Sequence, residues 1–353
     1  MTLRLAFLGD TLLGGVAQAT LDRRGYAYAF AGLKPLLSEA DLVIVNHEGP
    51  LTLAQQPVQK TDTGRKRYWY RGCPISAEAM RDAGVGVASL ANNHVLDFGI
   101  RGLMDTITAL DSAGIAHCGA GQDEAEARLP AVVNIGGCRV GFLSYMQRYA
   151  IYLLEDQYAL KDRAGCARLQ LEKVPADLAA LRRVADIRIV LVHWGRNYRA
   201  VSPRQDRLAV ALREAGADMV IGHHPHIPQR VDLSGDSPVF FSLGNGPLGT
   251  PGRFHGKRPP FGLVALVDVN DSNRISGVEI WPIAVDNSRV EFSPVPVGGS
   301  VGANVIRSLV TTGGDWESVE VRGTGVRWQS TTAHGPGLPP RLAGASPSGP
   351  APA

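Results

Sequence analysis

The sequence has few cysteines and no long hydrophobic run. Its four cysteines, Cys73, Cys118, Cys138 and Cys166, are scattered over 353 residues with no CxxC spacing, which argues against a disulfide framework or a zinc knuckle. No window approaches the roughly 18 consecutive apolar residues of a membrane helix. The N-terminus shows neither the basic region nor the apolar run of a signal peptide. We therefore expect no membrane span and a cytoplasmic location.

The chain also lacks a strong excess of charge of either sign. Its 36 Lys and Arg residues against 33 Asp and Glu residues leave a formal net charge of +3. A dedicated nucleic-acid binder would gather its Lys and Arg residues into one region, so we expect no nucleic-acid partner. The hydrophobic content of 44% excludes a disordered, collagen-like or coiled-coil chain and is typical of a globular protein with a large core.

Short apolar runs alternate with segments of helical spacing. The predicted strands are residues 3–8, 41–45, 84–90, 131–135, 139–144, 187–192 and 218–221, and the predicted helices are residues 33–40, 77–84, 101–113, 174–184 and 204–215. Residues 131–144 form a predicted hairpin, and the later runs 238–242, 262–269 and 275–282 are predicted antiparallel strands that close the domain. This alternation predicts an α/β fold.

The C-terminal part of the chain differs in pattern from the rest. The helical spacing fades after about Val290, and from Ser330 the composition turns to Gly, Pro, Ala and Ser, which is typical of disorder. We predict one domain over residues 1–289, a C-terminal extension over 290–329 and a disordered tail over 330–353.

Polar side chains follow several predicted strands where each strand ends. They are Asp10, Asn46, Glu48, Asn93, His94, Asp97, His193, His224 and His226. In α/β sheets, ligands gather outside the carboxyl ends of the strands. Carboxylate, carboxamide and imidazole donors without a nearby thiolate favour a catalytic-type ion over a structural zinc. A carboxylate such as Glu48 can bridge two ions about 3.5–4 Å apart. The sequence thus predicts one or two divalent metal ions, with Mn, Zn, Fe and Ca as the candidates.

Six sequence strings, in order, carry a specific resemblance. They are Phe-Leu-Gly-Asp (7–10), Asn-His-Glu-Gly-Pro-Leu-Thr (46–52), Ser-Leu-Ala-Asn-Asn-His-Val-Leu-Asp-Phe-Gly (89–99), His-Trp-Gly (193–195), Ile-Gly-His-His-Pro-His (221–226) and Ser-Leu-Gly-Asn (242–245). Together they resemble the CapA family, which is associated with poly-γ-glutamate capsule synthesis and has the calcineurin-like metallophosphatase fold. The resemblance covers about residues 1–285. It implies a metallophosphatase-like two-sheet β-sandwich flanked by helices.

The resemblance also implies a role for individual residues. By position, it assigns Asp10, Glu48 and His226 to one metal ion and Glu48, Asn93, His193 and His224 to the other. His94 would be the general acid or base, and Asp97 is placed to orient a histidine from outside the ligand set. Two departures matter. Leu12 stands where the broader pattern has a histidine, which leaves one ion a ligand short, and Asn197 stands where many relatives have an acidic residue.

Several of these residues also have ordinary structural explanations. Asp10 follows a glycine and could cap a helix, Asn46 could form a turn, and His193 could be a core histidine. His223 is expected to face away from the site, since alternate residues of an extended chain point in opposite directions. His47 is treated as structural.

Basic residues near the predicted site are candidates for substrate binding. Arg196 and Tyr198 follow the candidate ligand His193, and Arg253 and His255 belong to the loop 252–260. Arginine forks suit carboxylates and phosphates. The alternative for the loop 252–260 is an ordinary solvated surface loop. The basic and aromatic stretch 65–70 could recognise a peptide, or could be a strand with a charged approach.

Three functional hypotheses remain open at the level of the sequence. The first is metal-dependent hydrolysis or transfer with an activated water on a peptide-like or poly-γ-glutamate-type substrate, or on a phosphoester. The second is a cytoplasmic peptide epimerase that tailors a ribosomal peptide by Cα proton exchange. The third is a non-catalytic binding protein that has kept the fold.

Overall fold

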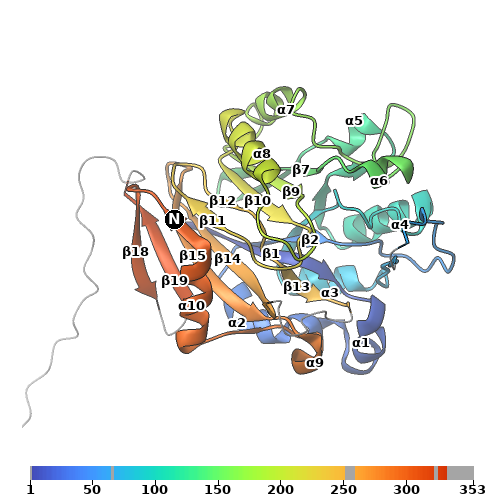
Figure 1. Ribbon diagram of the computed structural model, residues 1–353, viewed down its shortest axis with the longest axis horizontal. Helices are drawn as coiled ribbons and strands as arrows, with labels where there is room; N and C mark the ends of the chain where they lie inside the picture. The colour runs from blue at the N-terminus through green and yellow to red at the C-terminus, as the bar shows by residue number, and fades with distance from the viewer. Residues whose placement is uncertain (1, 65–66, 251–258, 322–324, 332–353) are drawn as a thin grey trace, which may run out of the picture.

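Two β-sheets face each other, with helices on both outer sides (Figure 1). The computed structural model describes residues 2–64, 67–250, 259–321 and 325–331. Among these residues, none of the helices has the length and apolar character needed to cross a bilayer.

The first sheet joins the N-terminal strands to the C-terminal ones, in the order β18-β19-β15-β14-β1-β2-β3-β4. Its strands are β1 (Leu3–Leu12), β2 (Leu42–His47), β3 (Val85–Ser89), β4 (Ala116–Cys118), β14 (Phe261–Val269), β15 (Ile275–Ala284), β18 (Trp316–Val321) and β19 (Gly325–Ser330). Strand β13 (Asn245–Leu248) pairs with β1, and β16 (Val295–Pro296) pairs with β15. Strands β1 to β4 run parallel to one another, so their carboxyl ends meet at one edge.

The second sheet has the order β17-β11-β12-β10-β9-β7-β6. Its strands are β6 (Ala131–Ile135), β7 (Cys138–Met146), β9 (Ile187–His193), β10 (Met219–His223), β11 (Val231–Leu233), β12 (Val239–Phe240) and β17 (Val310–Thr312). Strands β7, β9 and β10 are parallel, while β6 and β7 form the expected antiparallel hairpin. A separate two-stranded sheet pairs β5 (Ala120–Gly121) with β8 (Gly165–Cys166).

Helices cover the outer face of each sheet. The helices are η1 (Gly15–Ala17), α1 (Gln18–Arg24), η2 (Tyr26–Leu33), α2 (Lys34–Leu37), α3 (Ser76–Asp82), α4 (Gly99–Ser112), α5 (Glu124–Ala127), α6 (Ala150–Leu154), α7 (Val174–Leu181), α8 (Pro203–Glu214), α9 (Asn287–Val290) and α10 (Gly299–Leu309). Helices α1 to α4 pack on the first sheet and α7 and α8 on the second. Ser202 and Gln205 form a capping box at the start of α8, which satisfies backbone N–H groups that the first turn leaves free.

The apolar core lies in three layers because both faces of the central strands are buried. In β1, Leu5 and Phe7 point between the two sheets, whereas Ala6 and Leu8 point toward the helices. A strand buried on both faces is apolar at every position rather than at alternate ones. This is why residues 5–8 form a continuous apolar run in the sequence.

The α/β sandwich flanked by helices is confirmed, and most predicted elements are present within a few residues of their expected ends. The expectation for residues 238–242 was wrong in part: β12 is antiparallel to β11, but it lies inside the second sheet and runs parallel to β10. The expected loss of helical structure after Val290 was also wrong, because α10 spans Gly299–Leu309.

The C-terminal part of the described chain joins the first sheet. Strand β19 pairs with β15 and ends at Ser330, so Ser330 itself belongs to a strand. Residues 332–353 of the predicted tail lie outside the described residues. The domain boundary at residue 289 stays a prediction.

Candidate metal centre

The carboxyl ends of strands from both sheets bring the predicted site residues together. In the first sheet, Asp10 of β1 lies opposite Asn46 of β2 and Asn245 of β13. In the second, His193 at the end of β9 lies opposite His223 at the end of β10. All of these side chains are buried. The site therefore forms where the two sheets end. This agrees with the rule that ligands of α/β folds bind outside the carboxyl ends of the strands.

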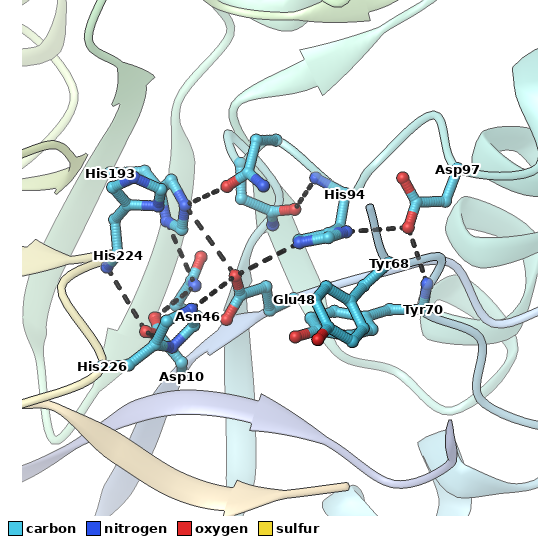
Figure 2. Close-up of polar contacts among 12 residues, drawn as sticks. Asp10, Asn46, Glu48, Tyr68, Tyr70, His94, Asp97, His193, His224 and His226 are labelled. Carbon is cyan, nitrogen blue, oxygen red and sulfur yellow. Dashed lines mark hydrogen bonds and ion pairs between the residues drawn. The ribbon is translucent and has the colours of Figure 1, made fainter. Parts of the chain in front are cut away.

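Two groups of ligand atoms share one carboxylate. One group contains Asp10, Glu48 and His226, the other contains Glu48, His193 and His224, and in each group the ligand atoms lie within 4.8 Å of one another. Figure 2 shows Glu48 between the histidines. Its Oε1 atom is 3.7 Å from Nε2 of His226 and 4.0 Å from Nε2 of His193. The shared carboxylate is thus in the position of a bridge.

The unpaired atoms of these groups fit a bound cation. Both carboxylate oxygens of Glu48, and Nδ1 of His224, are buried without a hydrogen-bond partner among the described residues. Buried polar atoms are nearly always paired, and an unpaired buried carboxylate is costly. Carboxylate and imidazole donors without a thiolate are compatible with a divalent metal ion.

Amide side chains hold the candidate ligands in place. Oδ1 of Asn93 is 2.7 Å from Nε2 of His193, and Oδ1 of Asn245 is 3.0 Å from Nδ1 of His226. The predicted role of Asn93 as a ligand of the second ion stays a prediction. Asn245 was not among the predicted site residues, although it ends the Ser-Leu-Gly-Asn string at 242–245. The motif was therefore visible, but its role in orienting a histidine was not.

Asp10 and Asn46 both lie in strands. Asp10 is inside β1 and accepts a hydrogen bond from Nδ2 of Asn46 at 2.8 Å. The helix that follows is capped by Gly14, so the capping interpretation of Asp10 was wrong. His47 is buried with both ring nitrogens unpaired among the described residues, and burial lowers its pKa to about 4.

The two groups of ligand atoms differ in how they hold protons. Burial and then the charge of Asp10 raise the pKa of Glu48 well above its usual value. Burial alone lowers the pKa of His226, but the charge of Glu48 and the hydrogen bond to Asp10 raise it to about 9. In the second group, burial lowers the pKa of His224 to about 3 and that of His193 well below 6.5. His226 is therefore protonated near pH 7, whereas His193 and His224 are neutral.

Metal binding is expected to release protons at the first group. A ligand must be deprotonated to coordinate a metal, so an ion held by Asp10, Glu48 and His226 displaces the proton that His226 holds. Affinity at this group should rise with pH up to about 9. Isothermal titration calorimetry in buffers of different ionisation enthalpy measures the protons released. Release of fewer than about half a proton per ion at pH 7 would contradict this prediction.

His94 is held by a buried set of contacts beside the two groups. Its Nδ1 atom is 2.7 Å from Oδ2 of Asp97, and its ring stacks on Tyr70 with the centroids 3.9 Å apart. The Tyr70 N–H donates to Asp97 at 2.6 Å, and Nζ of Lys60 is 2.5 Å from the other Asp97 oxygen. Burial lowers the pKa of His94. With Nδ1 directed at a carboxylate, Nε2 faces Glu48 at 3.9 Å.

The contacts of Lys60 and Tyr70 were not predicted from the sequence. Tyr70 ends the basic and aromatic stretch 65–70, for which peptide recognition or a strand with a charged approach was considered, but not a contact with His94. No sequence pattern pointed to Lys60 as a site residue, because it lies in a segment without regular secondary structure. Its position depends on tertiary contacts, including a hydrogen bond to the backbone oxygen of Tyr68 at 2.7 Å.

The loops that carry the histidines have an unusual backbone conformation. His224 has φ 98°, His226 has φ 58° and Tyr198 has φ 57°. Positive φ is costly for residues other than glycine, and such residues gather at functional sites where the surroundings hold them. This conformation turns both histidine rings toward Glu48 (Figure 2).

A polar pocket of about 170 Å³ opens onto this site. Four tyrosines, Tyr68, Tyr70, Tyr152 and Tyr198, contribute to its wall together with His94 and His226. The predicted substrate residue Tyr198 therefore faces the pocket. Arg196, predicted with it, lines a neighbouring groove instead.

The other predicted residues have different outcomes. Arg253 and His255 lie outside the described residues. Leu12 is a buried apolar residue of β1, so its position supplies no ligand atom. His223 belongs to neither group of ligand atoms, and its Nε2 is 3.3 Å from the backbone oxygen of Leu8.

The two-sheet fold and its strand-end cluster of buried carboxylates and histidines define a class of protein with a candidate metal centre. A family model described as bacterial capsule synthesis protein PGA_cap matches residues 4–246. The chain belongs to this family, as the CapA resemblance predicted.

Several characterised proteins are similar to this chain. The capsule biosynthesis protein CapA of Bacillus anthracis is 32% identical over 249 residues, which is 69% of this chain and 59% of that protein. The PGA biosynthesis protein CapA of Bacillus subtilis is 27% identical over 245 residues, covering 69% of this chain and 62% of that protein. The chain thus spans less than two thirds of either relative.

Two solved structures of bacterial proteins align with much of this chain. The calcineurin-like phosphoesterase YfkN of Bacillus subtilis aligns with a TM-score of 0.47 and 15% identity, over 81% of this chain and 92% of that one. The sulfate thiohydrolase SoxB of Thermus thermophilus aligns with a TM-score of 0.47 and 13% identity, over 81% and 57%.

Proposed function

We propose that this protein is a metal-dependent enzyme that hydrolyses or transfers a peptide-like or poly-γ-glutamate-type chain. The observation that carries the proposal is the buried Glu48 carboxylate, which has no hydrogen bond among the described residues and is shared by two groups of ligand atoms. Membership of a capsule synthesis family favours a polyglutamate-type substrate. The relatives named for capsule and PGA biosynthesis point in the same direction.

The chain's own residues would position the substrate and move protons. Divalent ions held by the two groups would acidify a water molecule and polarise the scissile carbonyl. His94, with its Nδ1 directed at Asp97, keeps Nε2 available on the side of Glu48 to take up or return a proton. Asp97 fixes the ring, and Lys60 balances the carboxylate charge. The stacked ring of Tyr70 prevents His94 from turning away.

Replacing Asp97 by Asn is expected to lower kcat by about 100-fold or more while leaving the metal content unchanged. The amide would still fit, but it would no longer select the His94 tautomer with the proton on Nδ1. The measurement is steady-state kinetics together with elemental analysis of the same preparation. Asp186→Asn, which breaks a surface ion pair with Arg139, is the control. An unchanged kcat in Asp97→Asn would remove His94 from the proposed mechanism.

The direct test is a product analysis on γ-glutamyl oligomers. The purified full chain is loaded with Mn, Zn, Fe or Ca and incubated with oligomers of defined length in ¹⁸O-labelled water. Hydrolysis adds the mass of one water, with the label, to the summed products, and transfer to an added amine gives a new adduct. Deuterium uptake at a Cα in heavy water without a change of chain length would indicate epimerisation instead. A fully loaded protein that converts none of these substrates would overturn the proposal.

A further inference from the structure

A second, strongly basic groove lies next to the metal pocket. It has a volume of about 720 Å³ and is formed after the ends of β7 and β9 and by the first turns of α8. Five arginines line it, and all are exposed: Arg148, Arg196, Arg199, Arg204 and Arg207. Its lining contains no Asp or Glu.

The arginines of this groove have no acidic partners within the described part of the chain. Elsewhere in that part most basic side chains near an acid form an ion pair, as Arg188 does with Asp218. The acidic residue closest in sequence, Asp206 of α8, is paired with Arg230 outside the groove. Five unbalanced guanidinium groups around one groove leave its surface strongly positive.

The position of Arg204 and Arg207 is unfavourable for the helix that carries them. Arg204 lies in the first turn of α8, where the helix dipole disfavours cations and Asp206 is the acidic residue, and Arg207 follows in the second turn. The capping box of Ser202 and Gln205 satisfies two of the N–H groups there, and a guanidinium has no acceptor for the others, so the arginines do not serve the cap. A charge arrangement that opposes local stability is more easily explained by an anionic ligand than by folding.

The groove and the metal pocket share a wall. In the loop after β9, Arg196 and Arg199 face the groove, whereas Asn197 and Tyr198 between them line the metal pocket. Tyr149, which lines the groove, has its ring 5.5 Å from the ring of His224.

The wall continues through a second tyrosine. The ring of Tyr149 also contacts the ring of Tyr152 at 5.4 Å, edge to face, and Tyr152 lines the metal pocket. A chain held in the groove would therefore be separated from the candidate ligands only by the side chains of this wall.

We propose that this groove binds an extended polycarboxylate chain and presents it to the metal pocket. The proposal rests on the proposed function, because it adds a chain-holding subsite to the same enzyme. Guanidinium forks match carboxylates in geometry, and several weak contacts along one chain add up to a useful affinity. A single-stranded nucleic acid fits less well, since it needs aromatic platforms for its bases. Tyr149 is the one aromatic residue of the lining, and its hydroxyl donates to the Gly195 carbonyl oxygen.

The test is direct binding of fluorescently labelled poly-γ-glutamate to the full chain in a chelator. Affinity should increase with chain length and fall with salt. The triple variant Arg148→Gln, Arg204→Gln, Arg207→Gln should bind long chains about tenfold more weakly. The matched control Arg182→Gln, Arg183→Gln, Arg274→Gln removes the same charge from exposed positions outside the groove and should bind normally. If the triple variant does not fold, Arg204→Gln and Arg207→Gln are measured singly, each with a smaller loss.

Several outcomes would overturn the proposal. An equal loss in the control variant would show that net charge alone binds the chain. Tighter binding of an oligothymidylate of equal length would assign the groove to nucleic acid. The proposed function can fail separately. If γ-glutamyl oligomers bind but are never cleaved or transferred, chain binding by the groove is supported and the proposed enzymatic activity is refuted. Conversely, the wild type could cleave short γ-glutamyl peptides while its binding affinity shows no dependence on chain length. That result would refute the proposed role of the groove but not the proposed enzymatic activity. His224→Ala, which alters the metal centre, should retain chain binding in the chelator.

Discussion

Replacing Glu48 by Gln should remove metal from both groups of ligand atoms at once and lower activity by about 1000-fold or more. The reason is geometric: Glu48 is the residue common to both groups. An amide keeps the size of the side chain but loses the negative charge that a divalent ion requires. Elemental analysis after dialysis and kinetics under saturating metal measure the two effects. A variant that retains full metal content would refute the bridging role.

The same substitution should stabilise the protein when no metal is present. Burial raises the pKa of Glu48, so its proton is held more tightly in the folded state than in the unfolded state. Such a group favours folding fully below its unfolded pKa, and this contribution is lost as the pH rises through the higher folded pKa. Gln does not titrate. We expect the metal-free variant to exceed the wild type by about 1–3 kcal/mol at pH 8, with little difference at pH 4.

Glu279→Gln is the matched control for a buried glutamate. Glu279 is equally buried, but it is paired with Arg4 in the first sheet. Its replacement should lower the free energy of unfolding by about 1–2 kcal/mol and leave metal binding unchanged. Urea unfolding in a chelator compares the two variants. If the change in the free energy of unfolding has opposite signs in Glu48→Gln and Glu279→Gln, the Glu48 carboxylate serves ligand binding and the Glu279 carboxylate serves the stability of the fold.

The strand-end residues could be predicted from the sequence because local pattern and topology agree there. The apolar runs of β1, β2, β9 and β10 identify buried strands, and parallel neighbours place their carboxyl ends together. Asp10, Glu48, His193 and His224 follow from that rule alone. The pairing of β12 does not, because a short apolar run carries no information on whether its neighbour is parallel.

Helix α10 and Lys60 could not be predicted, for a common physical reason. Helix α10 contains two glycines besides Asn304 in eleven residues, which is poor intrinsic helix propensity. It is stabilised by burying Ile306 in the core between the sheets. Lys60 is likewise placed by tertiary contacts to Asp97 and Tyr68 rather than by its neighbours in sequence. Long-range packing decides both positions, and a single sequence does not encode it in a local pattern.

The loop residues Arg196 and Tyr198, two positions apart, show how little closeness in sequence says about the direction of a side chain. Both were predicted to lie near substrate because they follow His193. The positive φ of Tyr198 and its backbone hydrogen bond to Pro225 at 2.8 Å turn its side chain into the metal pocket. Arg196 faces the other side of the same wall. A loop of three residues thus serves two cavities, which only the folded backbone reveals.

His224→Ala and His226→Ala should each remove one metal ion and lower activity by about 100-fold or more. Each histidine belongs to one group of ligand atoms, and Glu48 with its remaining partners stays in the other. Metal per chain, measured by elemental analysis, should fall from two to one in each variant if both groups are filled. Cys138→Ala, a buried position at the start of β7, should change neither quantity. Full activity in both histidine variants would refute the metal centre.

The stability of the two metal-free variants should separate loss of a ligand from damage to the fold. His226 is charged near pH 7 and 3.1 Å from Asp10, so His226→Ala leaves a buried carboxylate without its cation and should cost about 3 kcal/mol. His224 is neutral, and its Nδ1 is unpaired among the described residues, so its removal should cost less. If both variants lose metal and activity equally but differ in this way in unfolding experiments, the loss of activity follows the loss of the ligand. Equal destabilisation would instead indicate that the histidines act through the fold.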